Sequence, residues 1–156
     1  MSRWQNFNIW RGRLPHWRAD DVTYWVSFRH RRDLEAAERN LLFRALMRPE
    51  GRKWNLVILC ILPTETNLIF TVNRTAGGSP YELSDVVEKA KHKVGNAIVK
   101  KSGERWPPFY QESYDRIIRD ADELEAKLME ILESPVSHEL VEDPDEWDSL
   151  WVAGRD

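Results

Sequence analysis

The sequence predicts an α+β fold of the ferredoxin-like sandwich type, with an antiparallel sheet, helices on one face and an additional C-terminal helix. Three observations support this prediction. The expected elements follow the order strand, helix, two strands, helix, strand, helix. Two apolar runs, 54–62 and 67–72, are separated by a turn short enough for an antiparallel pair. The chain has 156 residues, of which 42% are hydrophobic, and this suffices for one domain with a core.

The first half of the chain should contain one helix and three strands. Residues 22–28 are predicted as the first strand. Asp33 can cap a helix that runs to about Met47, because the leucines and alanines after it form an apolar stripe at helical spacing. The runs 54–62 and 67–72 are expected to be the second and third strands, joined by a turn that contains Pro63.

The next helix has the clearest local signals in the sequence. Ser79 is a suitable cap, Pro80 fits the first turn, and Glu82 follows three residues after the cap. Apolar residues then recur at helical spacing to about Lys101, and Gly103 should end the helix.

The last predicted strand and helix follow directly. Residues 113–119 are expected to form the fourth strand. Asp120 leads into a helix whose leucines and isoleucine repeat at core spacing. This helix should end before Pro135, because a residue that precedes proline disfavours the helical conformation.

Charge and composition restrict the class of protein. The net charge of −3 conceals an asymmetry: residues 1–55 carry 12 Lys and Arg against 6 Asp and Glu, whereas residues 120–156 carry 2 against 13. A basic first part can bind an anionic partner. No apolar run approaches the roughly 20 residues that span a bilayer, so no membrane partner is expected. The single cysteine, Cys60, is expected to be a buried residue of a reduced, cytoplasmic protein.

The chain divides into three predicted parts. Residues 1–18 form a basic and aromatic arm, residues 19–152 the main domain, and residues 153–156 a tail. In the arm, arginines alternate with tryptophans without a helix or strand period. This combination suits phosphate neutralisation and base stacking.

The turn after the second strand, Leu62 to Ile69, reads LPTETNLI. With three further segments, Gly12–Trp17, Phe109–Asp120 and Leu128–Val141, it resembles the REP-associated tyrosine transposases, which are single-tyrosine HUH transposases. That family typically has Met-Pro-Asn-His-hydrophobic-His-Leu at this turn. The order and spacing of the segments agree over roughly residues 10–152.

The resemblance implies an enzyme that cleaves and rejoins DNA with a divalent cation and a tyrosine nucleophile. The two metal-binding histidines of the family fall at Glu65 and Asn67. The tyrosine falls at Glu130, and a third metal position falls at Ser134. Because all four positions are replaced, we expect a transposase-like protein that has lost strand cleavage and needs no cofactor.

Three alternatives stay open. Glu65 with Glu130 or Asn67 could form an all-oxygen site for Mg²⁺ or Mn²⁺ in an active transposase or nuclease with a rebuilt site. Tyr110 or Tyr114 could replace the nucleophile, although packing beside the fourth strand accounts better for both. The chain could also be a protein-interaction module without DNA binding. No metal-ligand spacing is present among the four histidines, which are His16, His30, His92 and His138.

The expected partner is single-stranded or hairpin DNA, and both a monomer and a homodimer are compatible with the sequence. DNA-binding candidates share a basic or aromatic side chain; the arm and the second helix match segments that the resembled family uses for DNA, and the arginines after the first strand would extend the basic patch. They are Arg11, Arg13, Trp17 and Arg18 in the arm, Arg29 and Arg31 after the first strand, and Lys89, Lys93 and Lys100 on the second helix.

Overall fold

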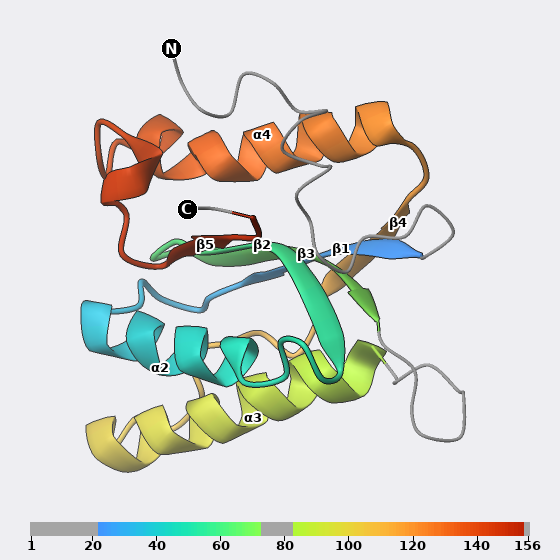
Figure 1. Ribbon diagram of the computed structural model, residues 1–156. Coiled ribbons are helices and arrows are strands. Elements are labelled where there is room, and N and C mark those ends of the chain that lie inside the picture. Colours follow the sequence, from blue (N-terminus) through green and yellow to red (C-terminus); the bar gives the residue numbers. More distant parts are fainter. Residues whose placement is uncertain (1–21, 73–82, 155–156) are drawn as a thin grey trace.

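The computed structural model describes residues 22–72 and 83–154. Its antiparallel sheet has five strands in the order β4-β1-β3-β2-β5 (Figure 1). The elements are β1 (Thr23–Arg29), α2 (Ala36–Met47), β2 (Trp54–Ile61), β3 (Glu65–Val72), α3 (Leu83–Ser102), β4 (Tyr114–Ile118), α4 (Ala121–Ser137), the short 3₁₀ helix η1 (Pro144–Glu146) and β5 (Leu150–Val152). The predicted α+β, ferredoxin-like sandwich with an additional C-terminal helix is confirmed, and β5 is a strand that the sequence did not predict.

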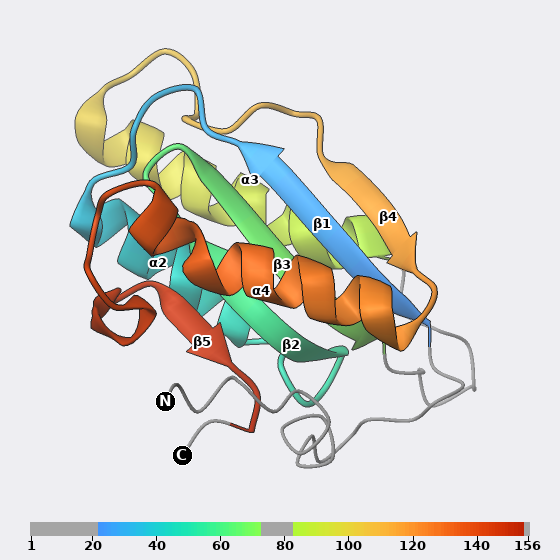
Figure 2. The same cartoon turned by 90° about the horizontal axis from the view of Figure 1, so that it is seen from above.

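The sheet lies between two helical layers. Helices α2 and α3 cover one face and α4 covers the other, as both views show (Figures 1 and 2). Each layer has its own apolar core: α4 packs with Ile58 and Ile69, whereas α2 and α3 pack with Leu59 and Phe70. Seven of the eight residues of β2 are buried, because this central strand has a helix on each side.

A β-bulge in β2 adjusts this two-sided packing. The register with β3 shifts between Leu56 and Ile58, so Val57 is an extra residue in the strand. As a result, both Val57 and Ile58 belong to the core under α4, and Leu56 and Leu59 belong to the core under α2 and α3.

Helix α4 does not end before Pro135, contrary to the prediction. It continues to Ser137, with Pro135 buried inside it. Proline has no N–H to donate to the carbonyl four residues earlier, which is that of Ile131. The Ser134 hydroxyl donates to the Ile131 carbonyl over 2.6 Å and takes the place of the missing donor. One extra turn therefore brings Ser137 and His138 to the pocket beside Glu65, where β3 begins.

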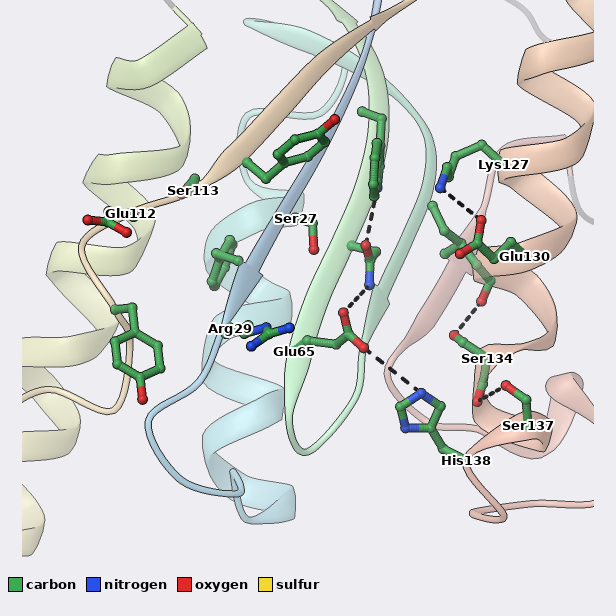
Figure 3. A pocket seen from close by; sticks show the side chains of 16 residues that line it. Ser27, Arg29, Glu65, Glu112, Ser113, Lys127, Glu130, Ser134, Ser137 and His138 are labelled. Atoms are coloured by element: carbon green, nitrogen blue, oxygen red, sulfur yellow. Dashed lines mark hydrogen bonds and ion pairs between the residues drawn. The ribbon is translucent and has the colours of Figure 1, made fainter.

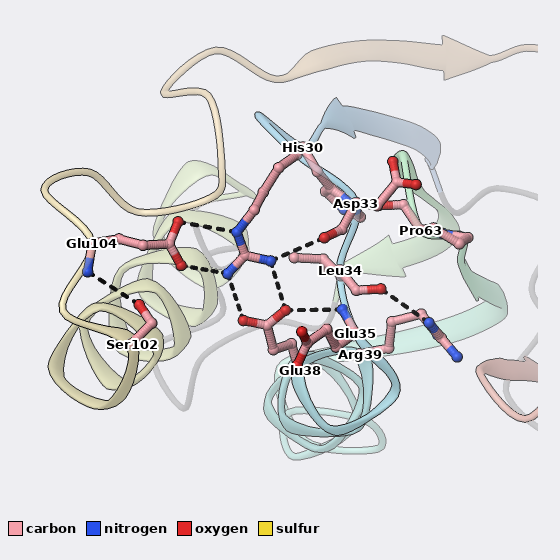
Figure 4. A network of polar contacts seen from close by, with 10 residues as sticks. His30, Asp33, Leu34, Glu35, Glu38, Arg39, Pro63, Ser102 and Glu104 are labelled. Atoms are coloured by element: carbon pink, nitrogen blue, oxygen red, sulfur yellow. Dashed lines mark hydrogen bonds and ion pairs between the residues drawn. The ribbon is translucent and has the colours of Figure 1, made fainter.

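Helix α2 starts later than predicted, because its N-cap is Glu35 and not Asp33. The Glu38 carboxylate accepts from the Glu35 backbone N–H over 2.9 Å, which is a capping box. Tertiary contacts fix this start (Figure 4): the Arg32 guanidinium makes bidentate contacts with both Glu38 and Glu104 at 2.6–3.0 Å. Arg32 thus joins the start of α2 to the end of α3, where Gly103 ends the helix with a positive φ, as predicted.

Three titratable side chains, His30, Glu38 and Glu104, have a lower pKa in the fold than their ordinary value. Burial lowers the pKa of His30, whose ring nitrogens contact the Pro63 carbonyl at 2.7 Å and the Thr66 hydroxyl at 2.8 Å. The hydrogen bonds from Arg32 lower the pKa of Glu38 and lower that of Glu104 to about 2.

Acid is therefore expected to destabilise the protein in two stages. Each of these pKa values is lower in the fold than in the unfolded chain, so stability is complete above the unfolded value and falls as the pH drops through the folded one. Protonation of His30 lowers the stability below its ordinary pKa of 6.5, and protonation of Glu38 and Glu104 lowers it further below their ordinary pKa of 4.5. Thermal unfolding across this pH range measures both stages.

The substitution Arg32→Met should lower the free energy of unfolding at neutral pH by about 1 kcal/mol, because it removes a partly screened pair of contacts. It should also flatten the loss of stability below pH 4.5, since the hydrogen bonds from Arg32 are the largest cause of the lowered pKa values of Glu38 and Glu104. The control is Arg44→Met, an exposed arginine in the last turn of the same helix. Equal acid profiles for the two variants would contradict this account.

Candidate functional site

A pocket of about 740 Å³ lies where α4 faces β1, β3 and the 110–114 segment. All four positions that the sequence singled out line it: Glu65 and Asn67 from β3, and Glu130 and Ser134 from α4. Figure 3 shows Glu130, Ser134 and His138 along α4 on the side that faces Glu65. The residues predicted to form one site are therefore brought together by the fold.

The two β3 residues, Glu65 and Asn67, make polar contacts with each other and with neighbouring side chains. The Trp25 indole N–H donates to Asn67 Oδ1 over 3.1 Å, and Asn67 Nδ2 donates to Glu65 Oε2 over 3.3 Å. Because an indole can only donate, it fixes the orientation of the amide. The second Glu65 oxygen lies 3.9 Å from His138 Nε2, a contact that becomes an ion pair when His138 is protonated.

The two α4 residues, Glu130 and Ser134, also make polar contacts with their neighbours. Lys127 Nζ donates to the Glu130 carboxylate over 2.8 Å and lies 3.8 Å from the centre of the Trp25 ring. The Ser134 hydroxyl already donates to Ile131, so Cys60 Sγ, 3.6 Å away, is placed to donate to Ser134 Oγ. Cys60 is fully buried, as predicted, and burial raises the pKa of its thiol to about 12.

These residues do not fit the metal centre that the resemblance implies. The Asn67 oxygen accepts a hydrogen bond from Trp25. Of the two carboxylates predicted as metal ligands, Glu130 is paired with the ammonium group of Lys127, and Glu65 accepts from Asn67. Within the described ranges no group of three or more His, Cys, Asp or Glu side chains converges on a point where a cation could bind. Mg²⁺ and Mn²⁺ favour such convergent oxygen donors.

Tyr110 and Tyr114 also line this pocket, and packing accounts for only part of each side chain. Tyr114 packs edge-on against Trp25, with ring centres 5.0 Å apart, yet 55% of it is exposed. Tyr110 lies under the Arg31 guanidinium at 4.8 Å and is 43% exposed. Arg29, another predicted DNA-binding residue, is exposed at the same pocket.

A second hollow, of about 220 Å³, lies between the end of α2 and α3, on the opposite face of the sheet from α4. We call it the basic groove. None of the described side chains that line it is acidic, and the basic ones are Arg48, Arg52, Lys53, Lys89 and Lys93. Two predicted DNA-binding residues, Lys89 and Lys93, are therefore joined by three basic residues from the α2–β2 connection.

The other predicted DNA-binding residues have different surroundings. Lys100 is exposed on the last turn of α3, beyond the residues that line the basic groove. Arg11, Arg13, Trp17 and Arg18 lie outside the described residues, as do the predicted helix signals at Ser79 to Glu82. Their roles stay predictions, and so do the predicted domain limits.

Comparison with known proteins agrees with this geometry at the level of the fold. The chain shares its fold with a REP-associated tyrosine transposase. The solved structure is of that transposase bound to a REP hairpin; the TM-score is 0.65, the sequence identity is 15%, and the match covers 88% of this chain and 82% of the other. No protein-family model and no curated protein matches the sequence. Within the described ranges, no helix is both long and apolar enough to cross a membrane.

Among the residues of this site that sequence reasoning missed, Trp25, Lys127 and His138 contact the predicted positions. The sequence analysis does not single out Trp25 or Lys127, and it finds no metal-ligand spacing for His138. The strand register explains the role of Trp25: on β1 it is paired with Ile69 of β3, two residues beyond Asn67, so the same strand pair carries both. For His138 no local signal existed, because its position depends on α4 continuing past Pro135.

Proposed function

We propose that this protein binds hairpin or structured single-stranded DNA through the basic groove and does not cleave the strand. The observation that carries the proposal is a groove lined by five basic side chains from two segments and by no described acidic one. Two segments that converge in this way give a concave surface, which suits a phosphate backbone better than a single solvated helix face does. The fold shared with a transposase that was solved with a REP hairpin supports the choice of nucleic acid.

The distribution of charge supports this choice of face. Among the charged residues of α4, Lys127 is the single cation, and the five acids are Asp122, Glu123, Glu125, Glu130 and Glu133. A phosphate backbone would be repelled from this helix and attracted to α2 and α3 on the other side of the sheet.

The chemistry of the pocket supports the proposed absence of cleavage. The position of the family's nucleophile holds Glu130, whose carboxylate is paired with Lys127 and cannot form the phosphotyrosine bond. The position of one metal ligand holds Asn67, whose oxygen is already bonded to Trp25. Neither attack on phosphorus nor polarisation of the phosphate is therefore provided by these residues.

Binding is tested directly with a labelled hairpin oligonucleotide in a mobility-shift titration across a salt series. We expect binding whose affinity falls steeply as salt rises, because phosphate contacts release counterions. A matched duplex of the same length tests whether the protein prefers the hairpin. Failure to bind any hairpin at low salt would leave the protein-interaction module as the better interpretation.

Cleavage is tested with the same hairpin and either Mg²⁺ or Mn²⁺, followed by a denaturing gel that separates free strand from protein-linked strand. The wild-type chain should give neither nicked product nor covalent adduct. The triple variant Glu65→His, Asn67→His, Glu130→Tyr restores the family residues at three positions. An adduct with wild-type protein that Glu65→Ala abolishes would support a rebuilt metal site and refute our proposal.

A further inference from the structure

Exposed aromatic side chains are concentrated in one short segment. Among the side chains that the structure describes, the large aromatic ones that are exposed are Trp106, Tyr110 and Tyr114, at 60%, 43% and 55%. All three lie in residues 105–114, which follow α3 and end at Tyr114, the first residue of β4; we call this stretch the aromatic segment. Exposed aromatic side chains that are grouped on a surface mark interaction sites.

The backbone of this segment is held tightly, although its aromatic side chains are exposed. The Arg31 N–H donates to the Pro108 carbonyl over 2.6 Å. Phe109, which is 5% exposed, packs its ring at right angles to that of Phe28. On α3, Gly95 lets Pro107 come close, because a Cβ at this glycine would lie 3.0 Å from the Pro107 Cβ.

A buried lysine fixes the second half of the segment. Lys91 of α3 is 5% exposed, and its ammonium group donates to the Gln111 carbonyl over 3.2 Å and to the Ser113 hydroxyl over 3.1 Å. It also lies 4.8 Å from the centre of the Phe28 ring. Tyr110 and Tyr114 therefore flank a backbone stretch anchored to α3, so their rings are presented with little conformational freedom left to lose on binding.

Basic side chains accompany the exposed rings. Arg31 lies over Tyr110 at 4.8 Å, and Arg105 lies over Trp106 at 5.3 Å. Arg29 lines the pocket beside Tyr110 and Tyr114. This interleaving of rings and guanidinium groups is the arrangement that single-stranded nucleic acids require, with bases on the rings and phosphates on the arginines.

We propose that the aromatic segment is a stacking platform for unpaired bases of a strand that continues from the hairpin; this rests on the proposed function. The bases stack on Tyr110 and Tyr114 at the mouth of the pocket, and the backbone runs along Arg29 and Arg31 outside it. Phosphates stay outside because Lys127 is already paired with Glu130, and the pocket is also lined by the carboxylates of Glu65 and Glu112. Uncharged bases meet no such repulsion.

The experiment compares three hairpins: one without a flank, one with a short unpaired flank, and one with the same flank made of abasic sites. The abasic flank keeps the phosphates and removes the stacking faces. We expect the wild-type chain to bind the base-bearing flank about tenfold more tightly than the abasic one. Tyr110→Ala with Tyr114→Ala should remove this difference and leave binding of the flankless hairpin unchanged.

Two further variants show whether the rings themselves are responsible. Tyr110→Phe with Tyr114→Phe keeps both rings and should retain the preference for the base-bearing flank. Ile117→Ala, an exposed apolar residue of the adjacent β4, is the control and should behave like the wild type. If the double alanine variant still discriminates base-bearing from abasic flanks, the platform is refuted while hairpin binding stands; if the wild type binds no hairpin, both proposals fall together.

Discussion

Replacing Lys89 and Lys93 together by glutamate is expected to weaken hairpin binding by about a hundredfold at moderate salt. Each lysine contributes attraction to a phosphate, and each substitution adds repulsion in a groove whose other charged side chains are basic. The slope of log affinity against log salt should also become shallower by about two units, one for each lost phosphate contact. Fluorescence anisotropy at several salt concentrations measures both quantities.

The control for this experiment changes the same amount of charge elsewhere. Arg116 and Arg119 are both exposed on or just after β4, at the far edge of the sheet from β2 and β5. Arg116 pairs with Glu123 at 2.7 Å, which is an exposed ion pair of small stabilising value. Arg116→Glu with Arg119→Glu should reduce affinity only slightly. If the arginine variant bound the hairpin as weakly as the lysine variant, affinity would depend on total charge and not on a defined groove.

Phe109→Ala is expected to cost about 3–5 kcal/mol of unfolding free energy, which is the range for removing a buried phenylalanine. The Phe109 ring packs at right angles to Phe28 at 5.9 Å and lies 5.6 Å from the ring of His30. Its loss leaves a cavity under the aromatic segment and next to the buried His30. Urea denaturation followed by tryptophan fluorescence measures the change.

The neighbouring Tyr110 provides the matched control. Tyr110→Ala removes an aromatic ring of nearly the same size one position along the chain, from a side chain that is 43% exposed. We expect it to change the unfolding free energy by less than about 1 kcal/mol. Equal costs for the two variants would mean that Tyr110 is a core residue, and this would also remove the physical basis of the stacking platform.

The sheet could be predicted because each of its main strands carries its own signal. The apolar run from Trp54 ends at a turn with Pro63, and the next run starts within a few residues, which is sufficient for pairing β2 with β3. β5 has no such signal. It is three residues long, and it becomes a strand only because Ile58 to Cys60 offer it a partner.

The error at the start of α2 has a tertiary cause, and the error at the end of α4 has a local one. Asp33 was the expected cap of α2, but Arg32 draws Glu38 into a network with Glu104, 66 residues further along the chain, and this makes Glu35 the cap. Local pattern reasoning has no access to such a partner. In α4 the Ser134 hydroxyl compensates for Pro135, which a rule based on proline alone does not consider.

The resemblance to the transposase family selected the four candidate positions, and periodicity explains why each pair shares a face. Glu65 and Asn67 lie two residues apart on a strand and so share a face, and Glu130 and Ser134 lie one helical turn apart on α4. Their convergence on one pocket follows once α4 covers that face of the sheet. His138 was not predictable for the same reason that α4 was predicted too short.

The opposite charges of the two helical layers have a consequence for the earliest stage of binding. With acids gathered on α4 and cations around the groove between α2 and α3, the molecule has a dipole moment directed across the sheet. In the field of a polyanion such a molecule rotates before contact, so collisions begin with α2 and α3 turned toward the polymer. At low ionic strength, this pre-alignment should appear as a faster association rate than random orientation permits.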